Sequence, residues 1–243
     1  MSQNLSSGPE PTVADLDRPL YTPIKRRSFF MYAGATAGAT ALVLAGCDKD
    51  DNNSPGMVNV GTSDVGVLNY AYALEQLEAD FYTQVRTGTY YTTIANAVEK
   101  QILDDLYYHE VIHRDFFKAA ITAAGATPIK ALTTVYPANT FSTKASVLNT
   151  AKAFEDLGVA AYNGAAQYIT KPDYLYLAGK IVSIEARHAA IIRDLVTEGS
   201  FVGSDIVDIA GNSLEMSKLP SVVVATANTF LADGSKLDVS GLG

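Results

Sequence analysis

Cysteine is nearly absent from this sequence, since Cys47 is the single one in 243 residues. One thiol excludes an internal disulfide framework and an electron-transfer module built on C-x-x-C pairs. Basic residues are outnumbered by acidic ones, and the formal net charge is −8 at pH 7. An acidic chain repels the phosphates of nucleic acid, so we expect no nucleic-acid partner.

Long apolar runs are scarce as well. The run between Arg27 and Leu44 is diluted by Gly, Ala and Thr, and it is too short and mild for a good transmembrane span. It follows a K-R-R-S-F-F stretch that resembles a twin-arginine export signal, with Arg26 and Arg27 as its arginine pair. It ends in L-A-G-C, which resembles a bacterial lipobox with Cys47 as the lipidated residue.

These two signals together predict where the protein resides. We expect residues 1–47 to be a lipoprotein signal peptide and the polar residues 48–63, which begin acidic, to be a flexible tether. The folded part is then exported and anchored to a membrane through Cys47, facing the periplasm or the cell surface. The alternative is an uncleaved N-terminal membrane helix, which also places the folded part outside the cytoplasm.

Histidine is the other scarce residue, and two of the three histidines stand three residues after a glutamate. The two pairs are Glu110 with His113 and Glu185 with His188. This spacing puts both side chains on one face of a helix, so a carboxylate and an imidazole can converge on one cation. Two such faces indicate two metal ions.

A second regularity precedes each E-x-x-H motif. Glu75 is followed after seven residues by Tyr82, and Glu155 is followed after seven residues by Tyr162. The lone glutamates are 80 residues apart (155 minus 75) and the motif glutamates are 75 apart (185 minus 110), which indicates an internal duplication. Four carboxylates and two neutral imidazoles balance the charge of two divalent cations, which makes their burial tolerable.

Apolar residues recur at helical spacing in four stretches, which we predict to be helices at 64–86, 92–125, 145–169 and 173–198. The six candidate ligands all fall inside the apolar stripes and therefore face the core. A buried carboxylate without a partner costs at least several kcal/mol. Four of them on one inner surface therefore require cations or water, and metal is the more economical explanation.

The links between these helices are short, long and short. The long link, Ala126 to Lys144, can extend to about 60 Å, whereas a 25-residue helix is about 37 Å long. We therefore predict an all-α fold: a four-helix bundle over residues 64–199 with a long crossover between its second and third helices. Residues 200–243 lack the ligand pattern and form a C-terminal extension packed on the bundle, with a short helix from about residue 219 to 231.

Two segments of the first helix, L-N-Y-A from Leu68 and L-E-Q-L-E-A-D-F-Y from Leu74, resemble the ferritin-like superfamily when taken with the two E-x-x-H motifs. The resemblance covers residues 64–232 and is closest to the exported, desiccation-related branch. It implies a di-iron or di-manganese centre with six ligands: Glu75, Glu110, His113, Glu155, Glu185 and His188. In that scheme Glu110 and Glu185 bridge the ions, each histidine binds one ion, and the lone glutamates are terminal ligands.

Four neighbouring residues have open roles. Glu78 competes with Glu75 for the inner face, but the duplication favours Glu75, because the position that corresponds to Glu78 in the second half is Gly158. Glu78 is retained as a support or an alternative ligand. Tyr82 and Tyr162 either fill the core or hydrogen-bond the ligands. His109 points about 100° away from Glu110 on a helix and is expected at the surface or the rim.

The resemblance implies redox chemistry at the metal centre, but it does not identify the reaction. Relatives with this ligand set include ferroxidases, rubrerythrin-like peroxidases and manganese catalases, so the substrate is a metal ion or a small oxidant such as oxygen or peroxide. The four methionines lie outside the predicted helices, which excludes a haem held by helix methionines. Iron and manganese both accept these ligands. The alternatives are a non-catalytic envelope or stress-protection module with weak or no metal, and a storage cage, which a lipid anchor disfavours; a homodimer is left open.

Overall fold

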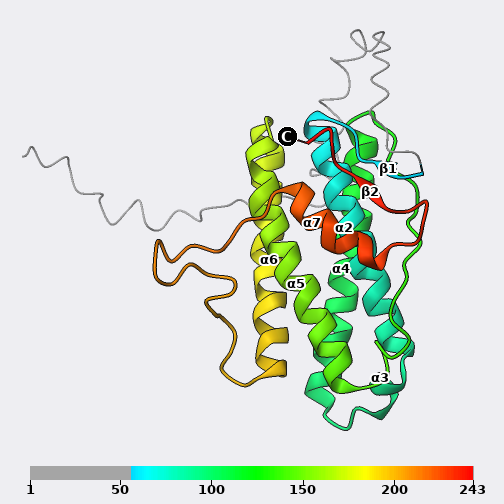
Figure 1. Cartoon of the computed structure of the whole chain (residues 1–243), viewed down its shortest axis with the longest axis vertical. Helices are drawn as coiled ribbons and strands as arrows, with labels where there is room; N and C mark the ends of the chain where they lie inside the picture. The colour runs from blue at the N-terminus through cyan, green and yellow to red at the C-terminus, as the bar shows by residue number, and fades with distance from the viewer. Residues whose placement is uncertain (1–55, 243) are drawn as a thin grey trace, which may run out of the picture. The chain divides into compact units, whose positions relative to one another are not determined.

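Four long helices form a bundle in the computed structural model, which describes residues 56–242 (Figure 1). They are α2 (Ser63–Thr87), α4 (Ala97–Ala123), α5 (Lys144–Ala165) and α6 (Pro172–Val196). The helix α2 packs mainly on α4, and α5 packs mainly on α6. The prediction of an all-α, four-helix bundle with its long crossover between the second and third long helices is confirmed. Arg26, Arg27, Cys47 and residues 48–55 of the expected tether lie outside the described residues.

The second of the four long helices, α4, differs from its predicted span of 92–125. A short helix, α3 (Thr89–Thr93), comes first, and α4 begins only at Ala97. The side chain of Asn96 accepts hydrogen bonds from the backbone N–H groups of Val98 and Glu99. This is the geometry of a helix N-cap, and it starts a new helix rather than continuing the earlier one. The apolar spacing runs through both helices, which is why it did not reveal the break.

The crossover from α4 to α5 is tied to the bundle by polar side chains of α2. Asn69 accepts a hydrogen bond from the backbone N–H of Ile129, and Gln76 accepts one from the N–H of Leu132. Asp80 accepts from the hydroxyls of Thr134 and Tyr136. An extended segment cannot pair its own peptide groups, so these side chains supply the partners that it lacks.

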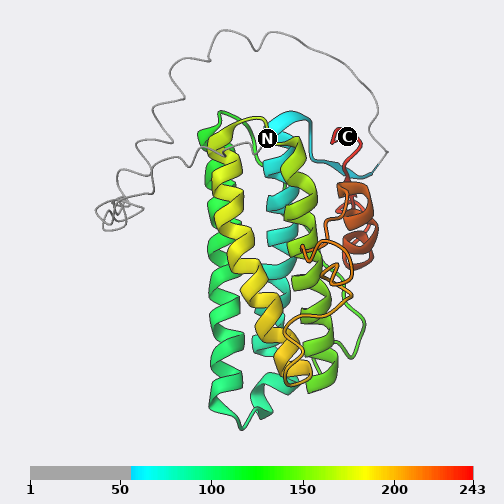
Figure 2. The same ribbon diagram turned by 90° about the vertical axis from the view of Figure 1, so that its left-hand side faces the viewer.

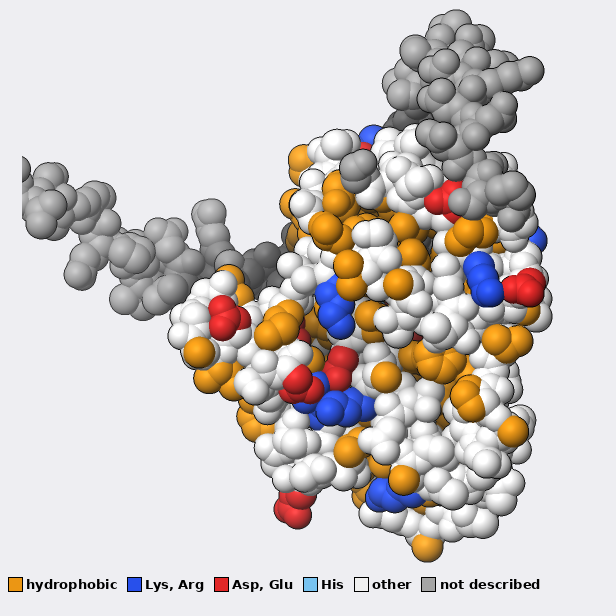
Figure 3. Space-filling model, viewed as in Figure 1, with side chains coloured by type: hydrophobic (Ala, Val, Ile, Leu, Met, Phe, Trp, Pro, Cys, Tyr) orange, Lys and Arg blue, Asp and Glu red, His pale blue; other side chains and the backbone are white. Residues whose placement is uncertain are grey.

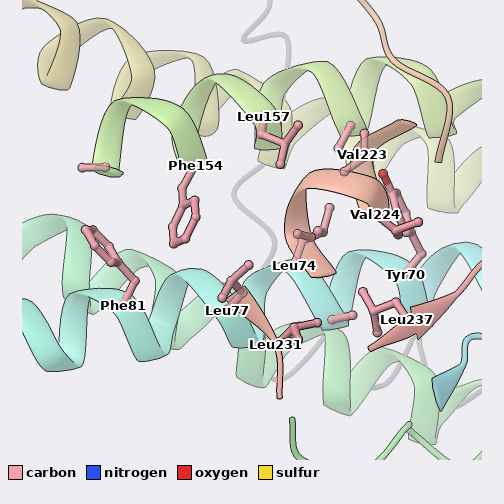
Figure 4. Packing of buried hydrophobic residues seen from close by; sticks show 14 of the residues in the cluster. Tyr70, Leu74, Leu77, Phe81, Phe154, Leu157, Val223, Val224, Leu231 and Leu237 are labelled. Carbon is pink, nitrogen blue, oxygen red and sulfur yellow. The ribbon is translucent and has the colours of Figure 1, made fainter. Parts of the chain in front are cut away.

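The C-terminal segment packs on the bundle along α2 and α5. It contains α7 (Pro220–Ala227), the turn η4 (Asn228–Phe230) and the strand β2 (Leu237–Asp238). Figure 4 shows its side chains packed with those of α2 and α5: Val223, Val224, Leu231 and Leu237 meet Leu74, Leu77, Phe81, Phe154 and Leu157. Viewed from the side in Figure 2, α7 lies outside the four long helices. The short helix expected near residues 219–231 is present as α7 and η4.

A two-stranded parallel sheet was not predicted. β2 pairs in parallel with β1 (Val58–Asn59), and Val58 and Val60 are buried. Residues 58–62 were expected to belong to the flexible tether, but here they run from this strand into α2. Two-residue strands carry no alternating pattern, so only their packing against the distant C-terminal segment defines them.

On the face shown in Figure 3, apolar side chains are scattered over the surface, and a few acidic and basic side chains lie among them. The buried guanidinium of Arg193 in α6 makes bidentate hydrogen bonds to Asp156 of α5 and also bonds Asp205. It thereby fixes the long loop after α6 to the bundle. Within residues 56–242, no helix combines the length and the hydropathy needed to cross a membrane.

Candidate metal centre

The six predicted ligands meet in the interior of the bundle. Glu75 comes from α2, Glu110 and His113 from α4, Glu155 from α5, and Glu185 and His188 from α6. All four glutamates are completely buried, while the imidazoles of His113 and His188 are 12% and 6% exposed. Helical periodicity explains the result, because each ligand occupies a core-facing position of its own helix.

The six side chains form two overlapping groups. The first contains Glu75, Glu110, His113 and Glu185, and the second contains Glu110, Glu155, Glu185 and His188. In each group, one donor atom per residue lies within 4.8 Å of every other. Glu110 and Glu185 belong to both groups, and each group has its own histidine and its own lone glutamate.

The two groups are related by the duplication seen in the sequence. His113 Nδ1 lies 2.7 Å from Glu185 Oε1 and 3.4 Å from Glu110 Oε2. His188 Nδ1 lies 2.7 Å from Glu110 Oε1 and 3.3 Å from Glu185 Oε2. Each histidine is thus closest to the glutamate of the other motif, so the two helices α4 and α6 build both groups jointly.

The lone glutamates complete this symmetry. His113 Nδ1 is 3.5 Å from Glu75 Oε2, and His188 Nδ1 is 3.5 Å from Glu155 Oε2. The remaining oxygen of each lone glutamate is held by a tyrosine of the other half. Tyr82 donates a 2.5 Å hydrogen bond to Glu155 Oε1, and Tyr162 donates one to Glu75 Oε1. Both tyrosines therefore contact candidate ligands, and each leaves one carboxylate oxygen facing the cluster.

Eight donor atoms at the centre are buried without a hydrogen-bond partner. They are Oε2 of Glu75 and Glu155, both carboxylate oxygens of Glu110 and Glu185, and Nδ1 of His113 and His188. Their mutual distances are short, yet none has hydrogen-bond geometry. A buried polar atom normally has a partner, and two metal ions would supply one to each of the eight. The donor set of carboxylate oxygens and imidazole nitrogens suits iron or manganese.

Without metal, the negative charge of the carboxylates is balanced by protonation of the two imidazoles. Burial lowers the pKa of His113, but contacts with Glu110, Glu185 and Glu75 outweigh it and raise the pKa to about 12. Burial also lowers the pKa of His188, and the nearby carboxylates again raise it overall. Burial raises the pKa of Glu110, yet the two imidazoles bring it down to about 2. Burial raises the pKa of Glu155 to about 7 in spite of His188.

Glu78 is a further buried carboxyl beside the cluster. It belongs to neither group, and its Oε2 has no hydrogen-bond partner. Burial raises its pKa well above the usual range, and the negative charges of Glu110 and Glu75 add to this. Gly158 of α5 leaves the space it occupies, since a Cβ at that position would lie 3.0 Å from Glu78 Oε1. One half of the duplication therefore has Glu78. The other half has Gly158 at the corresponding position, and this glycine leaves the space that the glutamate occupies.

His109 contacts the site from outside. It is exposed at the rim, as expected, but its Nδ1 lies 2.8 Å from Nε2 of His188. Burial and the neighbouring imidazoles of His188 and His113 lower the pKa of His109, so it is neutral near pH 7. A neutral imidazole can accept the outer N–H of His188. The sequence does not reveal this contact, because it depends on how α6 lies against α4.

A four-helix bundle that carries two buried groups of carboxylates and imidazoles has an architecture and a donor set that could hold metal ions. A family model for the ferritin-like domain matches residues 63–198, which is more than half of the chain. The chain therefore belongs to the ferritin-like domain family. No curated protein sequence matches it.

Proposed function

We propose that this protein binds two iron or manganese ions and uses them to oxidise metal ions or to react with oxygen or peroxide. The observation that carries the proposal is the set of eight unpartnered donor atoms from six buried side chains. A polar cluster of this size is costly in a core unless every member is satisfied. Metal ions satisfy them all at once and cancel the carboxylate charge.

The two groups suggest a role for each ligand. Glu110 and Glu185 are shared by both groups and would bridge the two ions, while His113 and His188 would each bind one through Nδ1. Glu75 and Glu155 would each offer a single oxygen, because a tyrosine hydroxyl holds the other. The bound ions would supply electron transfer to a small oxidant.

Elemental analysis of the purified full chain tests the proposal directly. We expect about two ions per chain, in keeping with two separate ligand groups, and close to none in Glu110→Ala, which removes a ligand of both groups. Asp105→Ala is the matched control, since Asp105 is exposed on the same helix and outside both groups. Oxygen and peroxide consumption by the loaded protein then identifies the oxidant. A well-folded wild-type chain that takes up neither metal supports the alternative, a non-catalytic envelope or stress-protection module.

We also propose that the protein is exported and anchored to a membrane through Cys47. The support is the succession of Arg26 and Arg27, a mild apolar run, and the L-A-G-C motif. Cys47→Ser should move the protein from the membrane fraction to the soluble fraction. Replacement of Arg26 and Arg27 together by lysine should keep it in the cytoplasm. Unchanged fractionation in both variants contradicts the anchor and the export route.

A further inference from the structure

A cavity of about 40 Å³ lies at the end of the bundle where α2 begins and α5 leads into α6. All four long helices line it, with Leu68 and Ala71 from α2, Phe117 and Ala120 from α4, Tyr162 from α5, and Leu177 from α6. The carboxylate of Asp64 also lines it, but both of its oxygens are occupied by the N–H and the hydroxyl of Thr170. The interior of the cavity is therefore almost wholly apolar.

This cavity lies directly behind the candidate metal centre. Tyr162 forms part of its wall and donates its hydroxyl proton to Glu75, so one side chain separates the cavity from a candidate ligand. Ala71 and Leu74, which also line it, come from the turn of α2 that precedes Glu75. A molecule held in the cavity would be one residue away from the cluster.

The apolar lining of the cavity determines which kind of molecule it can bind. A volume of roughly 10–15 Å³ can hold a water molecule, but the water also needs two to four polar partners. Among the lining residues, only the hydroxyl of Tyr70 is buried without a partner, which is too few to hold a water molecule. Hydrogen peroxide would lose its hydrogen bonds on entering, at a cost of kcal/mol order. An uncharged apolar molecule of two or three atoms pays no such cost and gains contact with the walls.

We propose that this cavity is a binding site for dioxygen beside the metal centre. The inference rests on the proposed redox function and makes it more specific, because it names dioxygen rather than peroxide as the oxidant that the interior admits. Tyr162 and Ala71 form the wall between the gas site and Glu75, and the apolar walls disfavour water in it.

Xenon is the probe for the cavity, since it is apolar and binds dry cavities in proteins. Crystals of the full chain are pressurised with xenon, and anomalous differences locate the bound atoms. We expect xenon between Leu68, Phe117 and Leu177. The absence of xenon from this cavity in the wild-type chain overturns the proposal. Xenon binding needs no metal, so its outcome is separate from the metal content that tests the proposed function.

A pair of neighbouring alanines on α4 provides the kinetic test. Ala120 lines the cavity and Ala119 is exposed, so Ala120→Leu fills the cavity while Ala119→Leu makes the same change at the surface. With equal metal content, Ala120→Leu should lose the xenon site and react with dioxygen several-fold more slowly, and its reaction with peroxide should be unchanged. Ala119→Leu should resemble the wild type in all three. An undiminished dioxygen rate in a variant that has lost the xenon site contradicts the proposal.

Discussion

At the scale of single residues, His188 illustrates how much of the site depends on its two ring nitrogens. Nδ1 faces three glutamates of the cluster at 2.7 to 3.5 Å, and Nε2 faces His109 at 2.8 Å. When Nδ1 binds a metal ion, the ring proton must be on Nε2, and His109 can accept it. In that state the contact with His109 would favour this tautomer of His188 and hold the orientation of its ring.

We predict that His109→Leu lowers the metal affinity of the chain about 10- to 100-fold, the usual effect of losing the partner of a ligating histidine. The free energy of unfolding of the metal-free chain should change little, since His109 is exposed. His109→Asn is the matched control, because its side-chain oxygen can take the place of Nδ1 as the acceptor. Competition with a chelator measures the affinities. Equal affinity in His109→Leu and the wild type shows that this contact does not position His188.

At the scale of helices, the duplication is imperfect at one pair of positions, and that imperfection determines how α2 and α5 approach. Glu78 on α2 has Gly158 opposite it on α5, with Oε1 3.0 Å from where a Cβ would lie. A Cβ at 158 would press against this buried carboxyl, which would have to shift by a few tenths of an ångström. Gly158 leaves the space in which Glu78 lies between the two helices beside the cluster.

Gly158→Ala should therefore destabilise the fold by about 1–3 kcal/mol, the usual cost of overpacking a core. Gly179→Ala provides the contrast, because Gly179 lies in the interior of α6 with no atom within 4 Å of the added Cβ. There alanine should stabilise by about 0.5–1 kcal/mol through its higher helix propensity. Chemical denaturation measures both variants. If Gly158→Ala is as stable as Gly179→Ala, the contact with Glu78 does not limit the approach of the helices.

At the scale of the whole molecule, the buried charges couple folding to pH. In the metal-free protein the pKa of His113 is about 12, against an ordinary value of 6.5, and that of Glu155 is about 7, against 4.5. The folded chain therefore holds protons that the unfolded chain has lost. For His113 the stabilisation is complete below pH 6.5 and is lost as the pH rises towards 12. For Glu155, stability falls between pH 4.5 and 7.

We predict that the free energy of unfolding of the metal-free chain decreases from pH 7 to pH 9, on the order of 1 kcal/mol per pH unit for each proton retained. Denaturant titrations in the presence of a chelator measure it. Metal binding must displace the same protons, so the apparent metal affinity should rise over this range. A stability that is constant or increases from pH 7 to 9 would show that the metal-free histidines are not protonated.

The sequence by itself determined which side chains belong to the site. The spacing of three within each motif and the apolar stripes are local properties of a helix, so Glu110 with His113 and Glu185 with His188 could be placed on core-facing positions without coordinates. The crossover could be inferred because the link of residues 126–144 is long enough to span a helix. A four-helix bundle with one long crossover follows from these features.

Only the tertiary structure decided which side chains of different helices contact one another. Each tyrosine bonds the lone glutamate of the other half, and His109 bonds a histidine 79 residues away. The start of α4 at Ala97, after the N-cap Asn96, and the pairing of β1 with β2 were also not predicted. Helical periodicity fixes the face on which a residue lies. It does not fix which residue of another helix lies opposite, because that depends on packing between segments distant in the chain.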